Sequence, residues 1–120
     1  MLNKDILTLF RGLQELSADS DVRLPAKVAF AIVRNLKSLA PIVEDIETAR
    51  FHIAETYGVP TEQGYSIPNV SRDAANEELN ELANTNVEVS IVTIKMSDIE
   101  NLSISVAAAE ALIFMVEEEA

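Results

Sequence analysis

The sequence predicts a mainly helical α+β fold in a single domain that covers residues 1–120. Apolar residues recur at three- and four-residue spacing through most of the chain, which is typical of helices with one buried face. One run with this spacing is more than thirty residues long, and a stretch near the C-terminus alternates apolar and polar residues instead. Only six of the 120 residues are aromatic, so the core must be built from aliphatic side chains, which suit helix-on-helix packing.

The first predicted helix is "NKDILTLFRGLQELS", residues 3–17. Asn3 is a residue type that caps helix N-termini, so we expect it to cap this one. The apolar residues share one face, which we expect to be buried. These residues are Ile6, Leu9, Phe10, Leu13 and Leu16.

The second predicted helix is the longest, "PAKVAFAIVRNLKSLAPIVEDIETARFHIAETY", residues 25–57, with Gly58 as its C-terminal stop. At 1.5 Å per residue it would span about 50 Å, which is longer than a small domain needs. We therefore expect it to project or to pack against another chain. Pro41 lies inside it and predicts a kink near residues 38–41 or two consecutive helices. The predicted buried face contains Val28, Ile32, Leu36, Leu39, Val43, Ile46, Ala49, Ile53 and Tyr57.

Residues 59–70 contain two prolines and a glycine and predict a loop or a tip that projects from the helices. Ser71 is then placed to cap a short helix over residues 72–84, with Ala75, Leu79 and Leu82 on its buried face.

The C-terminal part changes its periodicity twice. "VEVSIVTI", residues 87–94, alternates like a half-buried β-strand, and "SIS", residues 103–105, is a candidate second strand. A strand needs a hydrogen-bonding partner, for which the sequence offers "SIS", residues 59–70 or another copy of the chain. Between the two candidate strands, "SDIENL", residues 97–102, predicts one helical turn. Ser105 should cap a final helix, "VAAAEALIFMVEEE", whose apolar middle predicts burial on more than one side.

The charge is concentrated in the second half of the chain. Residues 1–58 hold seven Lys and Arg against eight Asp and Glu, a balance of −1, whereas residues 59–120 hold two against twelve, a balance of −10. Such a field repels phosphate backbones, so we expect no direct binding to nucleic acid. The candidate acidic contact surface comprises Glu77, Glu78, Glu81, Glu117, Glu118 and Glu119. The simpler interpretation is that these charges keep the protein soluble.

The sequence shows no constellation typical of an enzyme. The chain has no cysteine, its three glycines are isolated, and its serines lack a nucleophile-elbow context. The single histidine, His52, has only Glu55 and Asp45 on roughly the same helix side, so an ordinary partly buried histidine is the better interpretation. Paired carboxylates lack the Glu-x-x-His partners of carboxylate metal sites. We therefore predict a protein that is not an enzyme, with no catalytic residues, no metal and no cofactor.

Four basic residues gather around the start of the long helix: Arg23, Lys27, Arg34 and Lys37. One interpretation is that they form salt bridges to the acidic half, within or between subunits. The other is that they bind a small anion such as a nucleotide phosphate.

Two segments carry a resemblance to known proteins: "LPAKVAFAIVRNLKSLAPIVEDIETAR" and "NEELNELANTNVEVSIVTIKMSDIENLSISVAAAEALIFMVEEE". Over residues 22–57 and 75–119 the chain resembles small acidic proteins of unknown function encoded by tailed bacteriophages and prophages. The resemblance lies in the general sequence pattern and in the order of the segments. It includes no catalytic signature, so no functional residue is carried over. It implies a phage-encoded accessory or structural protein that acts inside a bacterial host or in the virion.

Together these observations predict a non-enzymatic protein that acts through self-association or through a host or virion protein. The alternative is an oligomeric binder of small anions or nucleotide signals that works against host defence. A third interpretation is an acidic mimic of nucleic acid that inhibits a host protein. The N-terminus lacks the features of a signal peptide, and no apolar run is long enough to cross a membrane, so we expect no membrane association and a location in the host cytoplasm or the virion.

Overall fold

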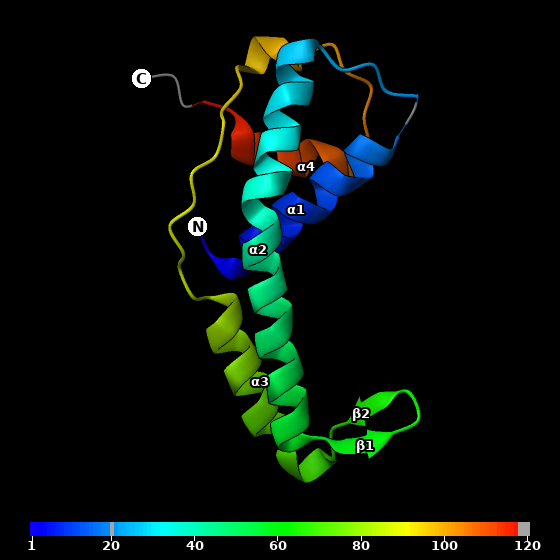
Figure 1. Cartoon of the computed structure of the whole chain (residues 1–120), viewed down its shortest axis with the longest axis vertical. Helices are drawn as coiled ribbons and strands as arrows, with labels where there is room; N and C mark the ends of the chain where they lie inside the picture. The colour runs from blue at the N-terminus through cyan, green and yellow to red at the C-terminus, as the bar shows by residue number, and fades with distance from the viewer. Residues whose placement is uncertain (20, 118–120) are drawn as a thin grey trace.

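A computed structural model describes residues 1–19 and 21–117 of the chain (Figure 1). It confirms the mainly helical α+β class. The described elements are α1 (Asn3–Ala18), α2 (Ala26–Tyr57), β1 (Val59–Thr61), β2 (Gly64–Ser66), α3 (Asn69–Ala83), a 3₁₀ turn η1 (Met96–Asp98) and α4 (Val106–Met115). The molecule is elongated, with principal extents of 51 × 33 × 22 Å. No helix in the described ranges is both long and apolar enough to cross a membrane.

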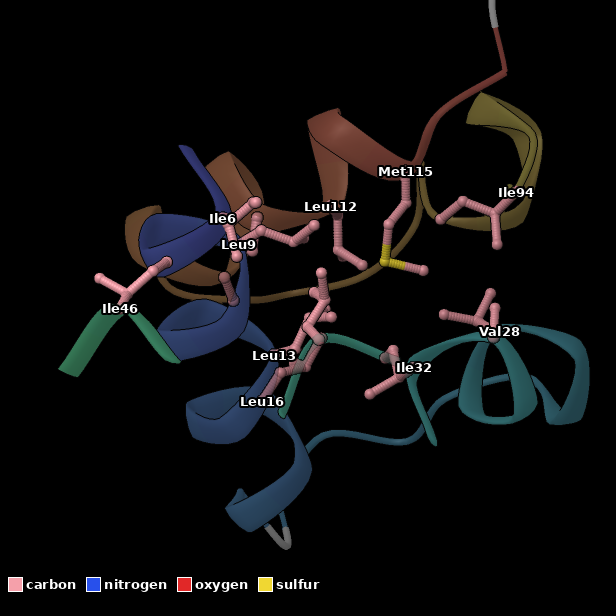
Figure 2. Packing of buried hydrophobic residues seen from close by; sticks show 14 residues of the cluster. Ile6, Leu9, Leu13, Leu16, Val28, Ile32, Ile46, Ile94, Leu112 and Met115 are labelled. Atoms are coloured by element: carbon pink, nitrogen blue, oxygen red, sulfur yellow. The ribbon is translucent and has the colours of Figure 1, made fainter. Parts of the chain in front are cut away.

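The main core lies where α1, α4, the segment around Ile94 and α2 as far as Ile46 meet, which we call the head (Figure 2). The predicted face of α1 is buried there, except that Phe10 is only partly covered. Helices α1 and α4 approach closely at Gly12, where a Cβ would overlap that of Ala111 and lie 2.9 Å from the Ala107 carbonyl oxygen. The buried apolar residues of the core are Ile6, Leu9, Leu13, Leu16, Val28, Ala31, Ile32, Leu39, Ile46, Ile94, Ala108, Ala111, Leu112 and Met115.

The second half of α2 leaves the head and packs against α3, and we call this pair the stalk (Figure 1). The helix α2 continues through Pro41 as one element, so the expectation of two consecutive helices is wrong. Pro41 lies on the exposed side of α2. The carbonyl group that loses its helical partner there can therefore be satisfied by water, which lowers the cost of the proline.

A two-stranded antiparallel hairpin, β1 and β2, forms at the far end of the stalk. It lies within residues 59–70, for which the sequence predicted a loop or a tip without assigning these strands. Gly58 ends α2 as predicted, and a Cβ on it would lie 2.9 Å from the Cβ of Tyr65. Gly64 has a φ of 122°, a left-handed conformation that favours glycine in the turn.

The segment over residues 87–94 is extended but is not a strand of a sheet, so the predicted β element lies elsewhere in the chain. Val87, Val89 and Ile91 do pack against the core, as the alternation predicted, whereas Val92 is exposed. The buried Asn35 takes the place of a partner strand: its Nδ2 donates to the Val92 carbonyl at 3.0 Å, and its Oδ1 accepts from the Val92 amide at 2.8 Å. At Ile94 the backbone pairs with residues 115 and 117 instead. Residues 103–105 form no strand either.

Two predicted helix caps are wrong and one is confirmed. Asn3 is the first residue of α1, and its side chain donates to the Leu82 carbonyl at 2.8 Å, so it ties α1 to α3. Ser71 lies inside α3, which already begins at Asn69. Ser105 caps α4, since its hydroxyl oxygen accepts from the Ala108 amide at 3.1 Å.

We predict that Asn35→Leu lowers the free energy of unfolding by about 1–3 kcal/mol, because the Val92 amide and carbonyl lose their partners while the volume is nearly kept. Urea unfolding measures the change, and hydrogen exchange should show faster exchange at the Val92 amide. Asn76→Leu, at an exposed site on α3, is the control and should stay within about 0.5 kcal/mol of the wild type. Unchanged stability with a protected Val92 amide would contradict the role given to Asn35.

Candidate interaction surfaces

The four basic residues predicted as a group do not converge on one site. Arg23 precedes α2, and Lys27, Arg34 and Lys37 are exposed along its first half. Lys27 forms a salt bridge to Asp98 of the same chain, with 3.7 Å between Nζ and Oδ2. The other three form no salt bridge within 4.0 Å to the residues that the structure describes.

The described members of the predicted acidic surface lie in two separate parts of the molecule. Glu77, Glu78 and Glu81 are exposed on α3 in the stalk, whereas Glu117 follows α4 in the head (Figure 1). Glu118 and Glu119 lie outside the described residues. The described acidic residues thus do not form one continuous contact surface.

The acidic end of the stalk perturbs one neighbouring group. A hydrogen bond to the Glu78 carboxylate, with smaller contributions from desolvation and from the charges of Glu78 and Glu77, raises the pKa of Tyr57 above its ordinary value of 10.0. The packing of α3 against α2 brings the Glu78 carboxylate close to the Tyr57 hydroxyl. The carboxylate accepts a hydrogen bond from the neutral phenol and repels the negative phenolate, so both effects favour the protonated form.

Exposed apolar side chains form the most unusual surface feature. The helix α4 buries only one face, formed by Ala108, Ala111, Leu112 and Met115, so the prediction of burial on more than one side is wrong. Ile113 is 64% exposed, and Val106 and Phe114 also face solvent. The reason is that α4 lies at the edge of the head and contacts α1 on one side. An apolar helix left open in this way is typical of an interface.

The helix α2 adds a second apolar surface. Phe30 is 63% exposed, Phe51 is 55% exposed and Val33 is 48% exposed. All three lie on the side of α2 that is opposite to its buried positions, because they are separated from these by about half a helical turn. This arrangement does not stabilise a monomer in water, because the exposed rings do not contribute the free energy that burial of apolar surface would provide.

Sequence reasoning missed a basic cleft between α1, α2 and α3. The cleft has a volume of about 310 Å³ and is lined by Lys4 and Arg11 of α1, Arg50 of α2 and apolar residues of α3. Asn3 also lines it and is 3% exposed, and its Oδ1 accepts no hydrogen bond from the described part of the chain. The seven-residue spacing of Lys4 and Arg11 could have indicated a shared face, but Arg50 comes from a distant segment.

The histidine and the carboxylates considered in the sequence form no catalytic or metal-binding cluster among the described residues. His52 is exposed on α2 and not partly buried as expected. Across residues 1–19 and 21–117, no three His, Asp or Glu residues are grouped so that they could hold a metal ion.

Comparisons with known proteins add no assignment. The chain matches no protein-family model, and searches against curated proteins and against solved structures found no significant match.

We predict that the pKa of Tyr57 depends on Glu78. In a Tyr65→Phe variant Tyr57 is the only tyrosine, so absorbance at 295 nm reports its titration. Its pKa should lie above 10.0, and Glu78→Gln should lower it, while Glu81→Gln serves as the control and should have little effect. The folded protein holds this proton more tightly than the unfolded chain does. Its contribution to stability is therefore complete below about pH 10 and is lost as the pH rises through the folded-state pKa.

Proposed function

We propose that this protein is a non-enzymatic phage accessory or structural protein that acts through protein–protein contacts, primarily through self-association. The observation that carries the proposal is the exposed apolar surface on α2, where Phe30, Val33 and Phe51 face solvent along the longest element of the fold. Large exposed apolar side chains that are interleaved with charged residues are typical of protein interfaces.

The shape of the molecule supports the same proposal. A helix of 32 residues extends well beyond the head that covers its first half, and α3 covers the rest on one side only. Most of this side of α2 is therefore accessible to another chain, and only near its end does a second element, the hairpin with Tyr65, pack against it at Phe51. The apolar face of α4, with Ile113 and Phe114, offers a second surface for a host or virion protein.

The phage assignment within this proposal rests on the resemblance of residues 22–57 and 75–119 to small acidic phage proteins. A site of action in the host cytoplasm or in the virion follows from that resemblance. The strongly negative C-terminal half supports solubility at high concentration and disfavours contact with nucleic acid.

We predict that the protein has a mass above its monomer value of 13.1 kDa when measured by light scattering at both low and high salt. The apolar contribution to self-association is not screened by salt, so the assembly should persist. Phe30→Ser combined with Phe51→Ser should shift the mass toward the monomer. Val70→Ser is the matched control, because Val70 is also an exposed apolar residue but lies at the start of α3. A wild-type mass of 13.1 kDa at every soluble concentration would contradict self-association.

A second candidate function, the binding of a small organic anion, is favoured by the cleft between α1, α2 and α3. Lys4, Arg11 and Arg50 line a partly apolar cavity of about 310 Å³, and of the three only Arg50 is paired, with Glu47 at 3.1 Å, among the described residues. The buried and unpaired Oδ1 of Asn3 would accept a hydrogen bond from a ligand hydroxyl or amino group. This combination fits a compact anion that also carries a donor, such as a nucleoside monophosphate. It moves the candidate anion site away from Arg23, Lys27, Arg34 and Lys37.

If the cleft binds such an anion, AMP should raise the melting temperature more than inorganic phosphate does, because binding to the native state stabilises it in proportion to ligand occupancy. The Lys4→Ala and Arg11→Ala double variant should lose the AMP effect. The Arg23→Ala and Arg34→Ala double variant removes the same charge elsewhere and should keep it. An unchanged melting temperature of the wild type with AMP would count against this second function.

A further inference from the structure

The open side of α2 presents a regular row of residues, which we call the outward face. These residues are separated by one, three or four positions and lie opposite the buried edge of the helix. One of them, Phe51, also contacts Tyr65 of the hairpin. All of them are exposed: Ala26, Phe30, Val33, Lys37, Ala40, Pro41, Glu44, Thr48, Phe51 and Glu55.

The outward face changes sign at its middle. Lys37 lies before Pro41 and Glu44 lies after it, about 10 Å apart along the axis at 1.5 Å per residue. Neither side chain forms a salt bridge with any described residue of its own chain. If two copies of α2 packed in parallel, Lys37 would face Lys37 and Glu44 would face Glu44. In an antiparallel pair each lysine faces a glutamate.

The apolar residues fit the same antiparallel arrangement. A two-fold axis between Ala40 and Pro41 places each residue opposite the one that is equally far on the other side. Phe30 then faces Phe51, and Val33 faces Thr48. Small side chains at the axis allow the two helices to approach closely, because the distance between packed helices depends on the side chains at the contact.

One aromatic residue of the outward face, Phe51, already has a packing partner within its own chain. The ring of Phe51 packs edge-on against Tyr65 of the hairpin, with 5.6 Å between centroids and 73° between planes. Phe51 nevertheless keeps more than half of its surface exposed. A Phe30 ring from another copy would complete an aromatic cluster there, which adds to the free energy gained from burial alone.

The geometry points to a second copy of this chain as the occupant of the outward face, bound antiparallel about a two-fold axis between Ala40 and Pro41. This inference rests on the proposed self-association and specifies its geometry. The interface is isologous, so the same residues are used twice and the assembly closes as a dimer. Lys37 and Glu44 set the direction, and Phe30 and Phe51 supply the apolar contacts at both ends.

The charge pair is tested by exchange. Lys37→Glu alone and Glu44→Lys alone each place like charges opposite one another, so each should weaken dimer formation by roughly tenfold or more at low salt. The double variant Lys37→Glu with Glu44→Lys restores opposite charges and should return the dissociation constant to near the wild-type value. Arg72→Glu and Glu88→Lys make the same charge changes at exposed sites off this face and are the controls. A double variant that is as weak as the single variants would overturn the inference.

The direction and register are tested by cross-linking, which is simple because the chain has no cysteine. Val33→Cys and Thr48→Cys proteins, mixed and mildly oxidised, should form a disulfide between the two variants. Thr48→Cys alone should not cross-link, because in this register its symmetry mate is about 22 Å away along the helix at 1.5 Å per residue. A Thr48→Cys protein that cross-links with itself, with no mixed product, would show a parallel pair and overturn the inference.

The outcomes separate this inference from the proposed function. If the wild type is a monomer, both fail. If the wild type is a dimer by light scattering but shows neither charge rescue nor the mixed disulfide, self-association stands and another surface, such as that of α4, forms the interface. Circular dichroism of each variant must match that of the wild type, so that a lost dimer is not confused with lost folding.

Discussion

The structure depends on one constraint: α2 is buried along a single edge. Its buried positions run from Val28 to Ile53 on that edge, and both parts of the molecule pack against it. The head packs on its first half and α3 packs on its second half. The opposite edge of α2 is exposed in both halves of the helix. The apolar and charged residues placed there are therefore free to serve contacts with another molecule.

The helices could be predicted because their signals are local. The spacing of Ile6, Leu9 and Leu13 is contained within α1 and needs no knowledge of the partner. The β element could not be located in this way. Residues 87–94 have the alternation of a strand, but their partner is the side chain of Asn35, which is more than fifty residues away. A polar residue on an otherwise apolar helix face was the only sign of it.

The surfaces could be predicted less well than the helices. The sequence identified the basic group around Lys27, but it could not show that Asp98 lies close to that lysine, because the contact depends on the path of residues 84–105. The all-apolar pattern of α4 indicated burial on several sides. Periodicity describes a helix and not its neighbours, and α4 has a close neighbour on one side only. The cleft with Lys4 and Arg50 requires the placement of three helices, which no local pattern contains.

The arrangement of the outward face also explains why apolar and charged residues are both needed. Apolar contacts of Phe30 and Phe51 supply affinity but little direction, since two phenylalanines pack acceptably in either orientation of the helices. Charges near the middle supply direction, because the parallel arrangement brings like charges together, but an exposed ion pair adds little affinity. Salt screens the charges and leaves the apolar contribution in place. Ionic strength should therefore affect the direction of pairing more than the existence of the dimer, as expected when affinity and orientation come from different residues.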